Sequence, residues 1–409
     1  MKTMGIGSAS ALALLFGACT AGSGAGEWAG VVRDSAGVVI LENPDHGMWP
    51  KGGGWSVVEE LRIGTLGGDL DQQFGQVGTV AVNSVGEIFV SDTQAQDVRV
   101  FSPEGAYLRT LGGPGSGPGE LGPGASVLLV SPGDTLLVPD PRNRRINRYA
   151  PDGTSLGSAS LDPERERVLR YNLNPLGAMA VQVRPVQSPN QPVIDTMDAI
   201  RIVETSGTFG DTLFRFPSGG LFQGPGIHYF TSEPMWEITD SLTLLYGVNS
   251  EYRIGVYGRD GALRRVISRA FVPPRISDRD IGALFSFLDQ AWLDAGVPPS
   301  RIEENHSLVH FAEFFPAYFF FQEGYQGTLW VQPVRPPGEL SEEAMARYNF
   351  TEDFGASGWE VFDREGRFLG VVEMPPRFQP RVFVENKIYG VLRDELDVQY
   401  VLRLRIVEG

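Results

Sequence analysis

The chain has 409 residues, with 34 Lys or Arg against 50 Asp or Glu, so its formal net charge is −16. This acidity excludes a large phosphate-binding surface, and we expect no nucleic-acid partner. The single Cys excludes an intramolecular disulfide and any zinc site built from several cysteines. The 51 Gly and 29 Pro predict many turns and few long helices.

Residues 1–18 have the pattern of a signal peptide, since Lys2 precedes an apolar stretch that is too short to span a bilayer. Residues 15–19, Leu-Phe-Gly-Ala-Cys, resemble the lipobox of bacterial lipoproteins, although Phe16 stands where that motif usually has leucine. The resemblance implies that Cys19 is lipidated and anchors an extracytoplasmic protein to a membrane of the bacterial cell envelope. An ordinary secretory signal that happens to contain a cysteine is the alternative. Residues 19–28 then form a flexible tether.

Residues 29–409 are expected to form a single domain that begins with two short β elements. The segment 29–41 predicts a hairpin, because valine-rich runs flank the turn Asp-Ser-Ala-Gly at residues 34–37. The segment 55–63 predicts a strand that has no sheet of its own.

A repeated pattern follows and is clearest in residues 74–113 and 121–161. Each copy contains a Gly turn, a strand ending in Asp (Asp92 or Asp140), a polar turn, a third strand and a Glu-Gly or Asp-Gly turn. Weaker copies of the third strand lie at residues 200–203, 254–257 and 359–362. A four-stranded unit repeated in this way indicates a propeller blade, because a single blade cannot bury both of its faces.

The first copy resembles the NHL-type repeat. The matching residues are Phe74-Gly75, Gly86–Asp92, Val98–Phe101, Gly105 and the connector Leu111–Leu121, which contains Gly-Pro-Gly-Glu. The resemblance extends over residues 55–408 and implies an all-β, six-bladed β-propeller of the NHL-repeat/TolB-like class found among exported bacterial proteins. We expect it to be a monomer.

The six blades are expected near residues 74–113, 121–161, 169–217, 228–270, 313–374 and 377–408. The third and sixth copies are weak, which leaves five or seven blades open. The last copy has room for only three strands, and a ring must close to leave no exposed edges. We therefore expect strand 55–63 to complete the last blade, with the hairpin 29–41 near that closure.

Two insertions interrupt the repeat. Between the fourth and fifth blades, within residues 277–312, Ser277 and Asp280 form a capping-box pattern ahead of apolar residues at helical spacing, and Gly296 ends the helix. This helix is expected to pack on the propeller rim, with a lid or partner-docking helix as the alternative. The second insertion, residues 335–358, is acidic and is expected to be a surface loop, either solvated or functional.

Candidates for chemistry are few. His306 and His310 are four residues apart, a spacing that zinc sites use, but the apolar residues between them favour a core element. Asp92 and Asp140 occupy matching places in two blades, which favours bonding to turn amides over metal binding. We therefore predict no metal and no catalytic residue, with a central divalent metal as the alternative.

Two further clusters have structural and functional interpretations. The second blade has a basic cluster that could face an anionic ligand or could simply keep the edge of the sheet exposed to water: Arg142, Arg144, Arg145 and Arg148. The aromatic run at residues 314–321 predicts a buried inner strand, with a sugar-stacking platform as the alternative. Neither a Gly-x-Ser-x-Gly elbow nor a phosphate-binding loop occurs.

Propeller architecture does not determine function. The first hypothesis is a non-enzymatic, membrane-anchored module that binds a protein, peptide or glycan. The second is a metal-assisted hydrolase or lyase with its site in the central channel. The third is a structural component of the envelope. Three or more Asp, Glu, Asn or His side chains converging on the channel would indicate an enzyme, whereas an apolar or aromatic groove there would indicate a binding module.

Overall fold

The computed structural model describes residues 26–161, 166–173, 179–186, 197–203, 208–217, 226–239, 241, 243–345, 348–350 and 353–409. The predicted signal peptide, Cys19 and all but the last three residues of the predicted tether lie outside these ranges. No helix in the described ranges is both long and apolar enough to cross a membrane.

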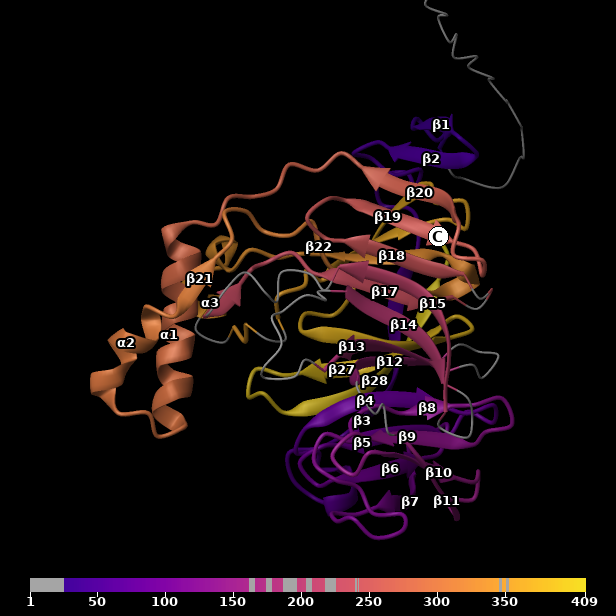
Figure 1. Ribbon diagram of the computed structural model, residues 1–409, viewed down its shortest axis with the longest axis vertical. Helices are drawn as coiled ribbons and strands as arrows, with labels where there is room; N and C mark the ends of the chain where they lie inside the picture. Colours follow the sequence, from indigo (N-terminus) through magenta and orange to yellow (C-terminus); the bar gives the residue numbers. More distant parts are fainter. Residues whose placement is uncertain are drawn as a thin grey trace, which may run out of the picture.

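The protein is a six-bladed β-propeller (Figure 1). The first three blades each have four antiparallel strands, in the order expected from the repeat. Blade 1 contains β4 (Val77–Val82), β5 (Ile88–Asp92), β6 (Asp97–Phe101) and β7 (Tyr107–Gly112). Blade 2 contains β8 (Leu129–Val130), β9 (Leu136–Asp140), β10 (Arg145–Tyr149) and β11 (Ser155–Ser160). Blade 3 contains β12 (Glu166–Leu173), β13 (Met179–Pro185), β14 (Met197–Val203) and β15 (Phe209–Pro217).

The remaining blades follow the same order, with additions at two edges. Blade 4 contains β17 (Pro234–Ile238), β18 (Leu244–Val248), β19 (Arg253–Tyr257) and β20 (Leu263–Arg269). Blade 5 contains β22 (Tyr318–Glu323), β23 (Leu329–Pro333), β24 (Gly358–Phe362) and β25 (Phe368–Glu373). Blade 6 contains β26 (Phe378–Val384), β27 (Lys387–Arg393), β28 (Gln399–Val407) and β3 (Ser56–Ile63).

The ring closes as predicted, by a strand from the beginning of the domain. β3 pairs antiparallel with β28, with Val57 opposite Ile406 and Arg62 opposite Leu402. Val57 of β3 and Leu402 of β28 enter the core between blades 5 and 6. Ile63 of β3 and Val401 of β28 enter the core between blades 6 and 1, and the two cores hold this junction together. Blade 6 is therefore built from two parts of the chain that are more than three hundred residues apart.

The predicted hairpin forms, but its predicted place near the closure is wrong. Its strands β1 (Val31–Ser35) and β2 (Val38–Asn43) extend blade 4 instead, because β2 pairs in parallel with β20. The Asn43 side chain fixes this position by donating to the carbonyls of Ser268 and Gly366 and accepting from the amide of Phe368. Figure 1 shows the hairpin stacked on β20, at the edge of a six-stranded sheet.

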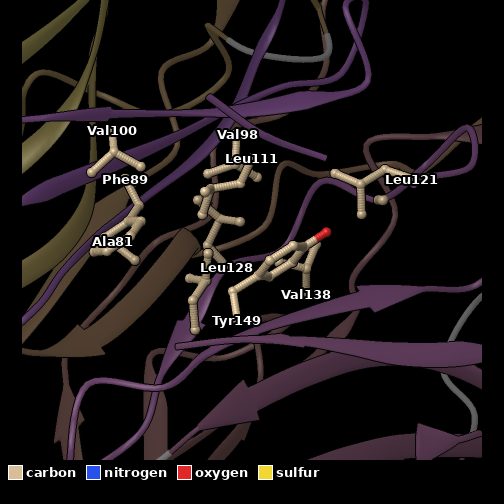
Figure 2. Packing of buried hydrophobic residues seen from close by; sticks show 11 residues of the cluster. Ala81, Phe89, Val98, Val100, Leu111, Leu121, Leu128, Val138 and Tyr149 are labelled. Carbon is tan, nitrogen blue, oxygen red and sulfur yellow. The ribbon is translucent and has the colours of Figure 1, made fainter. Parts of the chain in front are cut away.

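Apolar side chains fill the space between neighbouring blades. Figure 2 shows the cluster between blades 1 and 2, in which Phe89 and Val98 of blade 1 face Val138 and Tyr149 of blade 2. All four are nearly or fully buried. Burying one such side chain contributes about 1.5–3 kcal/mol, so these interfaces stabilise the ring.

The two insertions meet in a side module, defined here by residues 226–230, 272–317 and 334–357. It contains α1 (Asp278–Asp294), α2 (Ile302–His306), α3 (Glu342–Met345) and the parallel pair β16 (Ile227–Tyr229) and β21 (Val309–Phe311). The predicted capping box of Ser277 and Asp280 is present. The predicted packing of this helix on the propeller rim is wrong: Leu284 and Leu288 pack with Phe230 and Phe354 of the side module, because both insertions leave the ring on the same side and build a core of their own (Figure 1).

Short 3-10 turns complete the described structure, at Leu70–Gln72, Pro299–Arg301, Tyr325–Gly327 and Pro337–Glu339. The last of these belongs to the second insertion and contacts the capping box of α1. The amide of Gly338 donates to Asp280 Oδ1 at 2.6 Å. Asp280 is 3% exposed, so the carboxylate that caps α1 also fixes the second insertion against it.

Candidate ligand-binding site at one end of the propeller

The repeated aspartates hold turns together, as the sequence predicts. Asp92 accepts hydrogen bonds from the amides of Gly75, Gln94 and Ala95 at 2.8, 3.1 and 3.1 Å. Asp92 also forms an ion pair with the Arg99 guanidinium, 3.2 Å away. Asp92 is 1% exposed, so this carboxylate joins the start of blade 1 to the turn after β5.

Blades 2 and 4 use the same position in related ways. Asp140 accepts from the amides of Gly122 and Asn143 and pairs with Arg145 at 3.3 Å. In blade 4, Asn249 takes this place: its Oδ1 accepts from the amide of Glu233, and its Nδ2 donates to the carbonyl of Tyr318 in blade 5. These polar groups therefore build corners of the ring.

The arginine cluster of blade 2 is divided in role. Arg145 donates to the carbonyls of Ser116, Gly117 and Glu120 at 2.7–2.9 Å, so it clamps the Gly-Pro-rich connector. Arg148 donates to the carbonyl of Leu156 within its own blade. For these two residues the contacts favour the structural interpretation over an anion site.

Three of the four histidines, His228, His306 and His310, lie in the side module. His306 Nε2 is 2.6 Å from Asp289 Oδ1, and its ring packs on Phe285. His310 lies opposite His228 across the β16–β21 pair, with ring centroids 4.9 Å apart. Among the described residues, no group of three His, Cys, Asp or Glu side chains converges.

The predicted inner strand is present for the second half of the aromatic run, whereas Phe314 precedes it and is exposed. β22 is the first strand of blade 5, and its Tyr318 and Phe321 are buried. Burial raises the pKa of the Tyr318 hydroxyl well above its ordinary value, and its Oη has no hydrogen-bond partner in the described part of the chain.

A cavity of about 500 Å³ opens at one end of the innermost strands of blades 6, 1 and 2. It lies where first strands begin and second strands end, and we call it the mouth cavity. Its lining is mostly polar, with three arginines and three glutamines: Gln76, Val77, Gly78, Thr93, Gly124, Ser126, Arg377, Gln379, Arg381, Val391, Arg393 and Gln399. The cavity thus offers hydrogen-bond donors and acceptors from three consecutive blades.

Gly78 keeps this cavity compact. A Cβ at this position would lie 2.8 Å from the Ser126 side chain and 2.9 Å from those of Ser91 and Thr93. Any larger residue would therefore push blades 1 and 2 apart. Gln399 fixes the other side, because its Oε1 accepts from the amide of Val77 and joins blade 6 to blade 1.

A carboxylate from the side module holds two of the cavity arginines. Asp353, 9% exposed on its side chain, is 2.7 Å from Arg393 and 3.5 Å from Arg377. Burial alone would lower the pKa of Arg377, but its ion pairs with Asp397 and Asp353 raise it above its ordinary value. The second insertion is thus not merely a solvated loop, since Asp353 holds two of the arginines that line the cavity.

Sequence reasoning missed this arrangement. Asp353 was visible as one of several acidic residues in the insertion, whereas Arg377, Arg381 and Arg393 lie in the weakest repeat and were not singled out. A signal was nevertheless present: Arg393 ends the second strand of its blade, where blades 1 and 2 have aspartate. An arginine at that position requires a carboxylate from elsewhere.

Comparisons with known proteins support the architecture. A protein family described as "6-bladed beta-propeller" matches residues 68–174, which include blades 1 and 2. No curated protein matches the sequence. A solved structure from Bacteroides fragilis, named "Putative exported protein", is similar with a TM-score of 0.53 and 13% identity, over 90% of this chain and 100% of that one.

Two other solved structures match less well. One is virginiamycin B lyase from Staphylococcus aureus, with a TM-score of 0.40 and 13% identity, over 87% of this chain and 95% of that one. The other is the calcium-binding protein regucalcin from Agrobacterium tumefaciens, with a TM-score of 0.42 and 9% identity, over 87% and 96%. Nothing about the activity of this chain follows from either.

Proposed function

We propose that this propeller is an exported, lipid-anchored binding module of the NHL-repeat class, and that it takes its ligand, a peptide, a glycan or a segment of a protein, at the mouth cavity. The observation that carries the proposal is the cavity itself, about 500 Å³ in volume and lined by side chains from blades 6, 1 and 2. Pockets of several hundred Å³ with a few fixed polar groups are typical of ligand sites.

The lining suits a polar chain more than an apolar one. Gln379 and Arg381 come from β26, while Gln76 and Thr93 come from blade 1. Glutamine and arginine side chains recognise amide, hydroxyl and carboxylate groups by paired hydrogen bonds. Because the strands that carry them are rigid, these groups are held in place before a ligand arrives, which lowers the entropic cost of binding.

The anchor would place this cavity at a membrane surface. Cys19, followed by a short Gly- and Ser-containing tether, supports lipidation. The Bacteroides fragilis neighbour named for export agrees with an extracytoplasmic location. Metabolic labelling with a fatty-acid analogue should label the native protein and leave a Cys19→Ala variant unlabelled, whereas label retained in that variant would contradict lipid anchoring at Cys19.

The binding role is tested by filling the cavity. The soluble domain would be screened on arrays of hexapeptides and of neutral and acidic oligosaccharides, alongside a Thr93→Trp variant whose indole enters the cavity. Thr154→Trp, on an exposed outer turn of blade 2, is the matched control. We expect ligands that bind the native and control proteins and are lost with Thr93→Trp.

Ligands retained by Thr93→Trp would place the site elsewhere. Stoichiometric divalent metal in the protein as purified, measured before and after a chelator, would instead favour the metal-assisted hydrolase or lyase.

A further inference from the structure

Another arginine, Arg170, lies inside the ring, away from the three arginines of the mouth cavity. Arg170 is on β12, the innermost strand of blade 3. Its guanidinium carbon is 5.3 Å from the ring centroid of Trp236 and also 5.3 Å from that of Phe320. These rings come from the innermost strands of blades 4 and 5, so the side chain reaches across the axial side of blade 4.

The guanidinium of Arg170 makes no hydrogen bond or ion pair within the described part of the chain. Burial lowers its pKa below the ordinary value of 12.5, and the charge of the nearby Glu237 carboxylate opposes this effect. Glu237 Oε2 itself accepts from the amide of Glu323. The Arg170 side chain is only partly buried, and none of its nitrogens is both buried and unpartnered, so its N–H donors reach solvent and are accessible to a ligand.

The tryptophan beneath the guanidinium is fixed by a chain of buried polar groups. Trp236 Nε1 donates to Gln182 Oε1 at 2.8 Å, and Gln182 Nε2 donates to Asp198 Oδ2 at 2.7 Å. Arg184 then holds Asp198 through two bonds of 2.7 and 2.8 Å. Gln182 is also the strand partner of Arg170, so blade 3 positions both the cation and the ring that faces it.

We propose that Arg170 binds the carboxylate of a ligand in the central channel, and that the partly exposed Phe320 contacts an aromatic or apolar group next to that carboxylate, while the fully buried Trp236 supports the guanidinium. Cation–π contacts occupy the faces of a guanidinium and leave the N–H groups at its edge available. A carboxylate pairs with that edge through two parallel hydrogen bonds. The exposed part of Phe320 adds apolar surface beside it.

This chemistry favours a carboxylate over a phosphate. A single arginine supplies one positive charge, and Glu237 lies close enough to disfavour a dianion. The site is formed by blades 3, 4 and 5, whereas the mouth cavity is formed by blades 6, 1 and 2. The inference therefore does not depend on the function proposed for the mouth cavity.

Isothermal titration calorimetry tests the proposal with defined probes. N-acetyl-phenylalanine and benzoate supply a carboxylate beside an aromatic ring, N-acetyl-phenylalanine amide lacks the charge, and inorganic phosphate supplies a different anion. We expect the two acids to bind at millimolar concentration or below, and the amide and phosphate to bind at least tenfold more weakly.

Three variants connect this binding to Arg170. Arg170→Gln should weaken the binding of both acids about tenfold to a hundredfold, because charge-assisted hydrogen bonds are lost. Arg170→Lys keeps the charge without the paired geometry, so its affinity for the acids should lie between those of the native protein and Arg170→Gln. Arg167→Gln, on the same strand but exposed, is the control and should bind like the native protein. Thr93→Trp should also leave acid binding unchanged, which separates this site from the mouth cavity.

The melting temperature of the unliganded protein provides a second readout. If Arg170 awaits an anion, Arg170→Met removes a partly buried charge that has no partner in the described part of the chain and should melt at or above the native temperature. If Arg170 instead served to hold blades 3 to 5 together, the same variant would melt at a lower temperature. A lower melting temperature, equal binding of the amide, unchanged binding by Arg170→Gln, or no binding of either acid would each overturn the proposal.

Discussion

Blades 1 and 6 are neighbours in the ring, and they fix the same corner in opposite ways. In blade 1 the second strand ends at Asp92, which pairs with Arg99 on the next strand. In blade 6 the second strand ends at Arg393, and its carboxylate partner, Asp353, comes from the insertion in blade 5. The first corner is complete within its own repeat. The second depends on the side module, which connects the insertion to the wall of the mouth cavity.

The largest effect is expected from Asp92→Ala. The substitution leaves several backbone amides without their acceptor and removes one of the two acidic partners of the buried Arg99 guanidinium, so we expect a loss of about 3–5 kcal/mol of unfolding free energy. Urea unfolding measures it. Glu104→Ala, on an exposed turn of the same blade, should cost less than about 0.5 kcal/mol. Equal losses in the two variants would show that the carboxylate does not hold the corner.

Asp353→Ala should lower the unfolding free energy less than Asp92→Ala does, but its effect should extend beyond blade 6 into the second insertion. We expect a loss of about 1–3 kcal/mol, because Arg377 and Arg393 keep Asp397 as a second acidic neighbour. Hydrogen exchange should become faster in residues 337–345, which belong to the insertion, and remain unchanged in blade 1. Faster exchange in blade 1 alone would contradict the connection between the insertion and blade 6.

The smallest effect concerns Asp97, beside the blade 1 corner. Burial raises its pKa above the ordinary value of 3.8, the nearby Asp92 raises it further, and Arg99 opposes the rise. The protonated form therefore favours folding, and this contribution is lost as the pH rises through the raised pKa. Asp97→Asn, which mimics the protonated group, should stabilise the protein at pH 7 by up to about 1 kcal/mol and have little effect below pH 3.8. A gain that did not depend on pH would contradict this explanation.

The same comparison explains how much could be predicted from sequence. The turn role of Asp92, the capping box of Ser277 and the pairing of residues 55–63 with the last blade all follow from local patterns or from the need to close a ring. The parallel addition of β2 to β20 could not be predicted, because it joins segments far apart without any turn between them. Asp353 was equally hidden, since an acidic residue in a loop is usually solvated.

The channel site was hidden for a related reason. Arg170 lies in the weak third repeat, and its partners Trp236 and Phe320 lie in the next two blades. No spacing along the chain brings these residues together, because only the rotation of the blades about the axis does so. The architecture was therefore predictable, whereas the groups inside the ring required the structure.

The account depends most on the closure of the ring by β3 and β28, because the channel and the mouth cavity exist only in a closed ring. Ser56 and Val407 are opposite each other in this pairing, and Cys19→Ala removes the only native thiol. In that background, Ser56→Cys with Val407→Cys should oxidise to an intramolecular disulfide and raise the melting temperature. Ser56→Cys with Arg405→Cys, two residues out of register, should cross-link poorly. No cross-link in the first pair, or equal cross-linking in both, would contradict the closed propeller.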